Sequence, residues 1–499
     1  MALRLYDPWS RSRALANPHL RGSDNELQRH LVDLDIAFAK TSPRRLPSTT
    51  PWPSFIIHGA VLAFFFILLF RAFNPHGLFS WSAGLIYISY DTLLTAFVFV
   101  MTLPLIKRKA LPSPTRPMPT LSVLVACYNE ELNVGRMIRS LLAQLDPIET
   151  ILIVDDGSDD GTADILGGEF GLSMPQLGSM SGPSALYPTL QWLRLPHAGK
   201  ARALNAALVS VDTDLVVTVD GDTFLDVSAA RAIKVAFALD PSLVAATGVL
   251  TPVCSETLSG RFYQWFQTYE YIRNFLARYA WARTDSLLLI SGACAGFRRD
   301  AVLTVGGFDP DCLVEDYELI HRLRRFGADH GQRWTTTVVA GAKATTEAPS
   351  TITTFLQQRR RWFGGFLQTQ LLYRGMVGNP RYGRVGLIML PVKALDTLQP
   401  IYGLIALGLL PFYVATGHLH LLFPIGAWII AKIAIDFAFG LWSIHLYRRW
   451  VDPASSARVT VSILASFIEP FTYQVMRHTG AALGWLTFLR GGRWNETPQ

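Results

Sequence analysis

Apolar residues form long uninterrupted runs near both ends of this chain and short runs between polar turns in its middle. Near the start, Phe55–Phe70 and a second run from Trp81 to Ile106 are each long enough, with their flanks, to cross a membrane as a helix. Further candidate spans lie near Leu387–Ala415, Leu421–Tyr447 and Val459–Met476. Because Glu469–Pro470 breaks the last of these, we interpret it as an interfacial or re-entrant helix.

In the middle of the chain, strand-like and helix-like patterns alternate. LSVLVACYNEE, ILIVDDGSDDGT and LVVTVDGDT each begin as a buried strand and end in a polar turn. Asn133–Leu145 and Lys200–Val209 have helical spacing, and 167–188 has the composition of an extended loop. This alternation predicts a parallel, doubly wound α/β sheet. Right-handed crossovers would gather five polar side chains around one crevice at the carboxyl edge: Tyr128, Asp155, Asp156, Asp220 and Asp222.

These patterns divide the chain into five regions. They are an N-terminal tail (1–50), two membrane helices (51–109), an α/β domain (110–384), a C-terminal membrane region of about three helices (385–489) and a C-terminal tail (490–499). Basic residues at both outer ends of the first membrane pair place the N-terminus and the α/β domain in the cytosol. Arg490 and Arg493 favour a cytosolic C-terminus, whereas a simple final span would place it outside.

Composition agrees with a mixed membrane and soluble chain, since 50% of the 499 residues are hydrophobic. The net charge of +7 does not indicate nucleic-acid binding, because many basic residues flank the apolar segments and no zinc spacing or basic recognition helix occurs. Four scattered cysteines without a C-x-x-C pair fit a reducing compartment. The first apolar run starts too late for a secretory signal, so we expect it to be retained.

Asp220-Gly221-Asp222 places two carboxylates at the sheet edge where ligands gather in α/β folds. Mg²⁺ and Mn²⁺ bind carboxylate oxygens and often complete their coordination with substrate phosphates. A simple acidic turn is the alternative. Lys200 opens a helix, and a helix N-terminus with a lysine suits a phosphate group, although a solvated surface lysine has the same pattern.

Seven short motifs occur in a characteristic order: VACYNEE, VDDGSDDGT, HAGKARALN, VDGDT, SGACAGFRRDA, VEDYEL and QRRRW. Together they resemble the processive, membrane-embedded family-2 glycosyltransferases, which include cellulose, chitin, hyaluronan and poly-N-acetylglucosamine synthases. The resemblance covers about Leu121–Phe366 and the flanking spans. It implies a GT-A domain between two groups of membrane helices. It also implies transfer of a hexose from UDP-N-acetylglucosamine or UDP-glucose to a β-linked polysaccharide that is exported across the membrane.

The resemblance assigns roles to the donor side of the site. Contacts to the nucleotide sugar are implied for Tyr128, Glu130, Asp155, Asp156, Lys200 and Asp220. Asp220 and Asp222 match the acids that hold Mg²⁺ or Mn²⁺ against the diphosphate. Cys127 stands where the family commonly has threonine, a change that we expect to be tolerated.

On the acceptor side, Asp316 matches the general base that takes a proton from the attacking hydroxyl. Glu315 is its neighbour, and both acids would equally suit the N-terminus of a helix. Gln358, Arg361 and Trp362 match the Q-x-x-R-W signature, in which tryptophan stacks on the acceptor sugar; a helix at the membrane surface is the alternative. The loop behind the acceptor would contain Ser291 and Gly292, and the following AGFRR is closer to the N-acetylglucosamine polymerases.

Two other functions remain as alternatives. One is a non-processive transferase that adds one sugar to a membrane lipid, and the other is a transporter or scaffold with a degenerate transferase domain. The Q-x-x-R-W signature argues against the first and the intact acids against the second. We expect an integral protein of the bacterial inner or plasma membrane, with accessory or export subunits as candidate partners. Ionisable residues within the spans are hypothesised to line a polysaccharide channel: Asp91, Lys393, Asp396, Lys432, Asp436 and Glu469.

Overall fold

The computed structural model describes residues 24–72, 78–107, 114, 116–452, 465 and 467–490. Four sequence expectations therefore fall wholly or partly outside the described residues. They are the first half of the N-terminal tail, the boundary at 109/110, much of the candidate span 459–476, and the C-terminal tail after residue 490.

One mixed sheet organises the α/β domain. Its strands are β1 (Leu121–Cys127), β2 (Thr150–Asp155), β3 (Ser179–Met180), β4 (Leu190–Arg194), β5 (Leu215–Asp220), β6 (Thr223–Leu225), β7 (Leu243–Val253), β8 (Cys294–Arg298) and β9 (Thr335–Glu347). They lie in the order β3-β4-β2-β1-β5-β8-β7-β9-β6. The expected parallel pairing joins β4, β2, β1 and β5, whereas β8 runs antiparallel to both β5 and β7. The doubly wound fold class is confirmed, but the sheet is mixed rather than parallel throughout.

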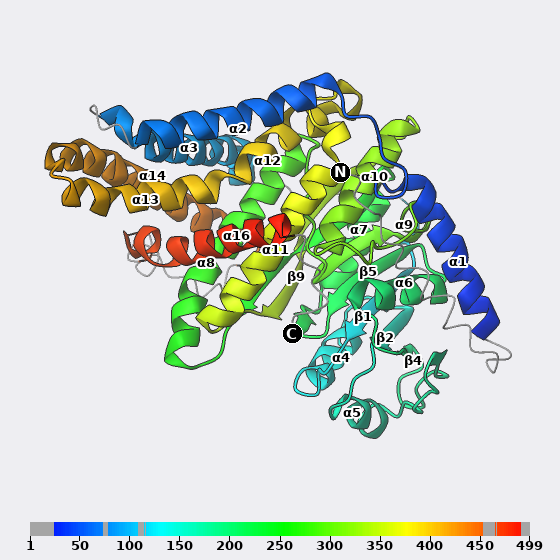
Figure 1. Ribbon diagram of the computed structural model, residues 1–499. Coiled ribbons are helices and arrows are strands. Elements are labelled where there is room, and N and C mark those ends of the chain that lie inside the picture. Colours follow the sequence, from blue (N-terminus) through cyan, green and yellow to red (C-terminus); the bar gives the residue numbers. More distant parts are fainter. Residues whose placement is uncertain are drawn as a thin grey trace.

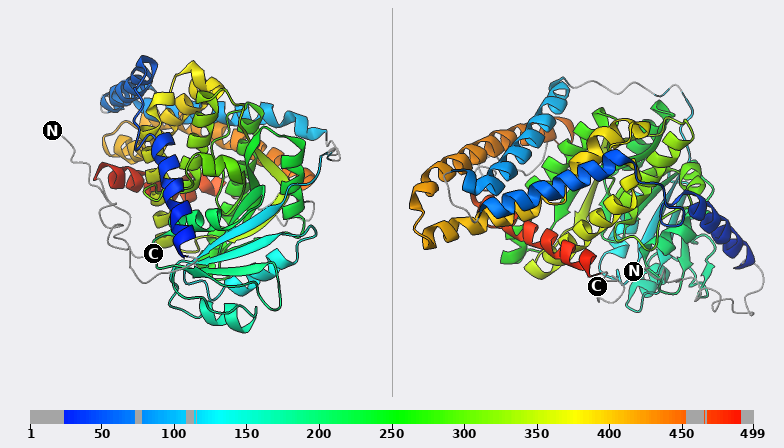
Figure 2. Two further views of the ribbon diagram at one scale, coloured as in Figure 1. Left: turned by 90° about the vertical axis from the view of Figure 1, so that its right-hand side faces the viewer. Right: turned by 45° about the horizontal axis from the view of Figure 1, so that its top comes forward.

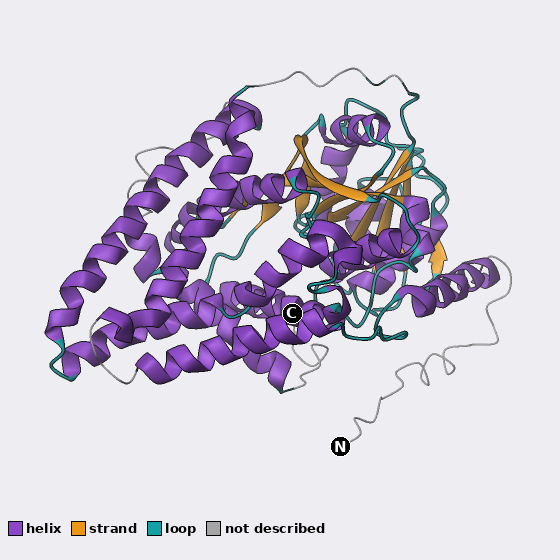
Figure 3. Cartoon of the chain, turned by 90° about the horizontal axis from the view of Figure 1, so that it is seen from above, coloured by secondary structure: helices purple, strands orange, loops and turns teal. Residues whose placement is uncertain are grey.

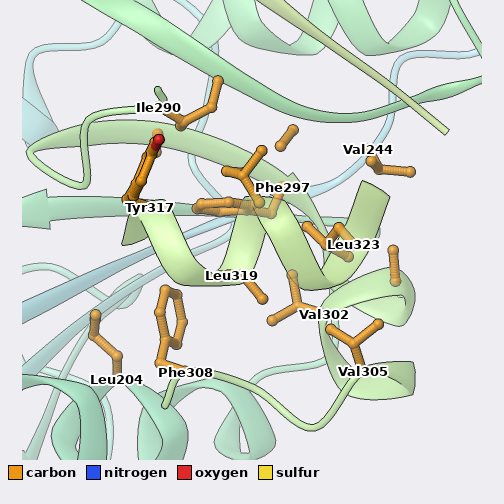
Figure 4. Close-up of a cluster of buried hydrophobic side chains, with 14 of the residues drawn as sticks. Leu204, Val244, Ile290, Phe297, Val302, Val305, Phe308, Tyr317, Leu319 and Leu323 are labelled. Carbon is orange, nitrogen blue, oxygen red and sulfur yellow. The ribbon is translucent and has the colours of Figure 1, made fainter. Parts of the chain in front are cut away.

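Helices cover both faces of this sheet. They are α4 (Val134–Leu142), α5 (Thr162–Gly168), α6 (Lys200–Ser210), α7 (Ala229–Leu239), α9 (Arg299–Thr304) and α10 (Glu315–Asp329). Successive residues of β1 point to opposite faces, so Leu124 packs in a core with α6 and α10, and Val123 in a second core with α4 and α7. Figure 4 shows Leu319 and Leu323 of α10 beside Phe297 of β8 in the first core. This packing fixes the start of α10 against the sheet.

Four helical stretches in the described residues have the length and apolar composition of membrane spans: 52–72, 82–106, 385–415 and 419–450. They contain α2 (Trp52–Ala72), α3 (Ser82–Thr102), α12 (Leu390–Asp396), α13 (Gln399–Ala415) and α14 (Leu422–Trp450). Figure 1 shows α2, α3, α13 and α14 projecting together to one side of the sheet domain, and Figure 3 shows from above that long helices lie to one side of the strands. The two N-terminal spans and the first two C-terminal spans predicted from the sequence are thus present as helices.

Three further helices lie between the apolar helices and the sheet: α8 (Leu258–Arg283), α11 (Ile352–Leu372) and α16 (Tyr473–Leu489). The candidate span 459–476 does not match the bounds of α16. A short 3₁₀ turn at Glu469–Phe471 precedes the helix, which begins only at Tyr473. Glycines let α16 approach α11 closely. A Cβ on Gly484 would lie 2.9 Å from the carbonyl oxygen of Arg360.

The N-terminal tail contains a helix that the sequence did not reveal, α1 (Asp24–Thr41). Figures 1 and 2 show α1 lying along the sheet domain, away from the apolar helices. Its Leu34 and Phe38 are each 5% exposed. Beyond the helix, Arg44 donates through Nε and Nη2 to Oδ2 of Asp309, at 3.0 and 2.9 Å. Part of the expected tail therefore belongs to the folded domain.

Ionisable residues within the apolar helices are paired. Lys432 lies 2.6 Å from a carboxylate oxygen of Asp91 on α3, and it also pairs with Asp436 one turn away. Lys393 pairs with Asp396 at 2.7 Å. Lys432 and Asp436 are four residues apart in one helix, so their pairing needs no channel, and the channel hypothesis stays a prediction.

Candidate functional site

The carboxyl ends of three parallel strands bring the predicted donor residues to one edge. Cys127 of β1 pairs with Asp155 of β2, and Ala126 pairs with Asp220 of β5. Glu130, which follows β1, packs against the turn after β5, because a Cβ on Gly221 would lie 2.7 Å from Cγ of Glu130. The missing side chain of Gly221 therefore leaves room for the Glu130 side chain beside the turn between β5 and β6.

Asp155 and Asp156, predicted as a pair, lie in different surroundings. Asp155 accepts the Ser158 amide through Oδ1 at 2.8 Å, while its buried Oδ2 has no hydrogen-bond partner among the described residues. Asp156 instead accepts the amides of Ala198 and Gly199, at 2.9 and 2.8 Å. Asp156 thus holds the turn before α6, whereas Oδ2 of Asp155 accepts no hydrogen bond from the described residues and lies 3.9 Å from Nε of Arg194.

Tyr128 offers a flat face at this edge, as predicted. Its ring centroid lies 4.2 Å from that of His197, and the two planes are tilted by 31°. Asn129, the next residue, has a φ of 55°, an unusual conformation for a residue other than glycine. Its side chain donates to Asp159 at 2.8 Å. Sequence reasoning missed Asn129 and His197, although both lie within the quoted motifs.

Asp220 and Asp222 lie on either side of the turn between β5 and β6. Asp222 Oδ1 accepts the hydroxyls of Thr223 and Thr346 at 3.2 and 3.3 Å. Burial and then the negative charge of Asp220 raise the pKa of Asp222 to about 6. No group of three or more His, Cys, Asp or Glu side chains suited to a metal occurs in the described part of the chain. Two carboxylates at a sheet edge fit a hard divalent cation that takes its remaining ligands from phosphate and water.

Lys200, the first residue of α6, joins the two acidic halves of the site. Its Nζ lies 2.5 Å from Oδ1 of Asp220 and 3.5 Å from Oε1 of Glu315. Burial lowers the pKa of Lys200, but the two carboxylates raise it by more, so the side chain stays charged. Lys200 therefore contacts both the predicted cation site, through Asp220, and the start of α10, through Glu315.

Asp316 lies in the first turn of α10. Its Oδ2 accepts the Gly292 amide and its Oδ1 the Tyr317 amide, both at 2.7 Å. Burial and then the charge of Glu315 raise the pKa of Asp316 to about 6, even though Lys200 acts in the opposite direction. A carboxylate held by two amides, with a pKa near neutrality, is suited to accept a proton. Ser291 and Gly292, predicted behind the acceptor, are thus beside the predicted base.

Gln358, Arg361 and Trp362 occupy one face of α11, because positions i, i+3 and i+4 of a helix are neighbours. All three side chains are partly buried. Trp362 packs against the core that contains Val314. A Cβ on Gly365, one turn further along, would lie 2.5 Å from Val314, so α11 touches the segment that leads into Asp316.

Two family models match the chain. A "Glycosyl transferase family 2" model matches residues 122–306, and a "Glycosyl transferase family group 2" model matches residues 215–446. The chain contains a family-2 glycosyltransferase domain. The matched residues of this transferase include the strand ends, Lys200, the predicted base and the Q-x-x-R-W helix.

Curated relatives and a solved structure agree with this assignment. The transferase is 26% identical, over 68% of its length and 74% of the relative, to a poly-beta-1,6-N-acetyl-D-glucosamine synthase of Staphylococcus epidermidis. The enzyme of the same name from Staphylococcus aureus strain COL is 27% identical, over 42% of this chain and 46% of the relative. The mannosyltransferase PcManGT of Pyrobaculum calidifontis, solved with GDP-Man and Mn²⁺, matches with a TM-score of 0.53 and 18% identity, over 82% of this chain and all of that one. This last similarity supports the GT-A fold.

Proposed function

We propose that this transferase moves N-acetylglucosamine from UDP-N-acetylglucosamine onto a growing β-linked polysaccharide. The similarity to curated poly-N-acetylglucosamine synthases, over two thirds of the chain, supports this choice of sugar over glucose. The same similarity does not favour the lipid-linked single transfer or the non-catalytic scaffold. The observation that carries the proposal is the bridge of Lys200 between Asp220 and Glu315, because it joins the proposed cation site to the residue next to the proposed base, Asp316.

On the donor side, each residue has a role that its contacts allow. The Oδ2 of Asp155, which accepts no hydrogen bond within the described part of the chain, would accept the N–H of uracil, and Tyr128 would contact the face of the base. Lys200 would exchange its contact with Asp220 for the diphosphate, since a lysine at a helix N-terminus favours anions. Asp220 and Asp222 would hold Mn²⁺ or Mg²⁺, which when bound neutralises charge on the leaving diphosphate.

On the acceptor side, Asp316 would take the proton from the attacking sugar hydroxyl. The hydroxyl oxygen forms a bond to the anomeric carbon while the bond from that carbon to the diphosphate oxygen breaks, and UDP leaves with the electron pair. One displacement inverts the anomeric configuration without a covalent enzyme intermediate. Trp362 would stack on the acceptor sugar, and Gln358 and Arg361 would contact its polar edge.

The apolar helices support a membrane location. Four stretches in the described residues have the length and composition of spans. We propose that the α/β domain faces the cytosol, where nucleotide sugars are made, and that the product is exported between the helices. Accessory subunits for export fit this arrangement as candidate partners.

A donor screen tests the proposed function. Purified protein in detergent is incubated with UDP-N-acetylglucosamine, UDP-glucose or GDP-mannose, each with Mn²⁺ or Mg²⁺, and UDP or GDP release is measured. We expect release with UDP-N-acetylglucosamine and a product degraded by an N-acetylglucosaminidase. Faster release from UDP-glucose would overturn the choice of sugar. Asp316→Asn, which preserves shape and removes the base, should lower release by about 10²- to 10⁴-fold.

A further inference from the structure

The helix of the Q-x-x-R-W signature contains a buried cation that the proposed function does not use. Arg359 is 3% exposed, and Glu270 of α8, 4% exposed, lies opposite it. Arg359 Nη1 donates to Glu270 Oε1 at 2.6 Å, and Nη2 donates to Oε2 at 2.9 Å. This two-pronged geometry fixes the plane of the guanidinium, which a single contact would not do.

The C-terminal helix completes this pair. The Tyr473 hydroxyl, from the start of α16, donates to Oε2 of Glu270 and accepts from Nη2 of Arg359 at 3.4 Å. A Cβ on Gly480 of α16 would lie 2.5 Å from Cβ of Arg359, so the two helices touch at this level. One buried polar cluster therefore joins α8, α11 and α16.

The same guanidinium supports the ring predicted to bind the acceptor. The Cζ atom of Arg359 lies 4.6 Å from the centroid of the Trp362 ring and 4.7 Å from that of Phe355. A guanidinium over an aromatic face attracts it and limits its rotation. Because Glu270 fixes the guanidinium, it also fixes the position of the indole.

We infer that Glu270 and Arg359 are positioning residues for the acceptor site, which hold the Trp362 ring in the orientation that receives the sugar. The inference rests on the proposed role of Trp362. A buried ion pair is weak evidence for stability, because apolar side chains of similar size often pack as well or better. The contacts of the Glu270–Arg359 pair indicate a more specific role, because the pair orients the Trp362 ring and joins it to α16.

The first test is Glu270→Gln, which retains the shape of the side chain and removes its charge. We expect kcat for UDP release to fall about tenfold or more, because small displacements of a positioning group carry penalties of up to about 100-fold. The KM for UDP-N-acetylglucosamine should stay unchanged, since the donor contacts lie on other elements. Product chains should be shorter.

A triple variant, Glu270→Met with Arg359→Met and Tyr473→Phe, separates positioning from folding. It removes the buried ion pair together with the hydroxyl that depends on it, and Arg477, which lies 3.9 Å from Glu270, is 27% exposed and stays hydrated. The thermal midpoint in detergent should therefore match or exceed that of the wild type. The deficit in kcat and the shorter product should nevertheless persist. Wild-type kcat and product length in this variant would overturn the inference and leave the pair as helix packing alone.

Two controls separate the outcomes. Lys234→Met removes a buried lysine of α7 that pairs at 3.0 Å with the exposed Glu149 in the loop before β2, and it should lower the thermal midpoint while kcat stays near wild type. Trp362→Ala tests the proposed function itself. If Trp362→Ala leaves kcat and product length unchanged, the platform role fails. If it lowers both and Glu270→Gln does not, only the positioning role fails.

Discussion

Docking of α1 on the transferase domain should be sensitive to a side chain at Gly306. This residue has a φ of +87°, and a Cβ built on it would lie 2.1 Å from the backbone nitrogen of Phe38. The neighbour is helix backbone, so no side-chain rotation can relieve the contact. Gly306→Ala should therefore displace α1 from the domain.

The size of the effect follows from what α1 buries. Leu34 and Phe38 are almost completely covered, and each such side chain contributes about 1.5–3 kcal/mol. Together they give ~3–6 kcal/mol before the entropy of ordering the helix is subtracted. Alanine at positive φ adds about 1–2 kcal/mol of backbone strain. A loss of ~3 kcal/mol of docking free energy corresponds to a more than 100-fold larger population of the state in which α1 is undocked.

Hydrogen exchange followed by mass spectrometry measures this opening directly. In Gly306→Ala, amides of residues 34–41 should exchange more than 100-fold faster, while those of β1 keep their wild-type protection. Gly178→Ala is the matched control, because Gly178 has a φ of +90° and nothing within 4 Å of a built Cβ. That control should leave α1 protected. Wild-type exchange of α1 in Gly306→Ala would refute the reasoning.

Three further predictions concern the site. At saturating Mn²⁺, kcat/KM should rise with pH through about 6 and then level off, because Asp316 must lose its proton to act as a base; a pH–rate profile without this acidic limb would contradict the assignment. Asp222→Ala should abolish transfer and Mn²⁺ binding, measured by equilibrium dialysis, while membrane insertion in cell fractions stays normal. Lys200→Met should raise the Kd for UDP about 10- to 100-fold in calorimetry, as expected for a lost charged hydrogen bond; an unchanged Kd would place Lys200 outside the donor site.

The strands around the donor site could be predicted because each is a short apolar run that ends in polar residues. Runs such as LVVTV are buried on both faces, and their order along the chain gives the parallel part of the sheet. The antiparallel insertion of β8 could not be predicted in this way. Its CAGFR sequence has no clear alternation, and its direction is set by pairing with β5 and β7.

The positions of the candidate site residues were predictable where they follow a strand directly, and less so where contacts join distant segments. The carboxylates at the strand ends followed from their spacing. Asp156 was grouped with Asp155, yet its oxygens hold the turn before α6, a contact across more than 40 residues of sequence. The Glu270–Arg359 pair spans 89 residues, and nothing in the pattern of α8 distinguishes Glu270.

Helix α1 escaped prediction for a related reason. Its first turn follows a polar, Arg-rich stretch, and its apolar residues alternate with charged ones without a long hydrophobic run. Its docking depends on Gly306 and Asp309, which lie more than 260 residues away in the sequence. The position of α1 can therefore be inferred only once the fold has brought the segment around Gly306 and Asp309 next to it.

The central claim is that this family-2 glycosyltransferase builds a polymer from UDP-N-acetylglucosamine with Asp316 as its base. Mass spectrometry of the products made by purified wild-type and Asp316→Asn protein, with UDP-N-acetylglucosamine and Mn²⁺, tests it most directly. We expect a ladder of N-acetylglucosamine oligomers and polymer from the wild type and none from the folded variant. A product with a single added sugar, or an unchanged ladder from Asp316→Asn, would contradict the account.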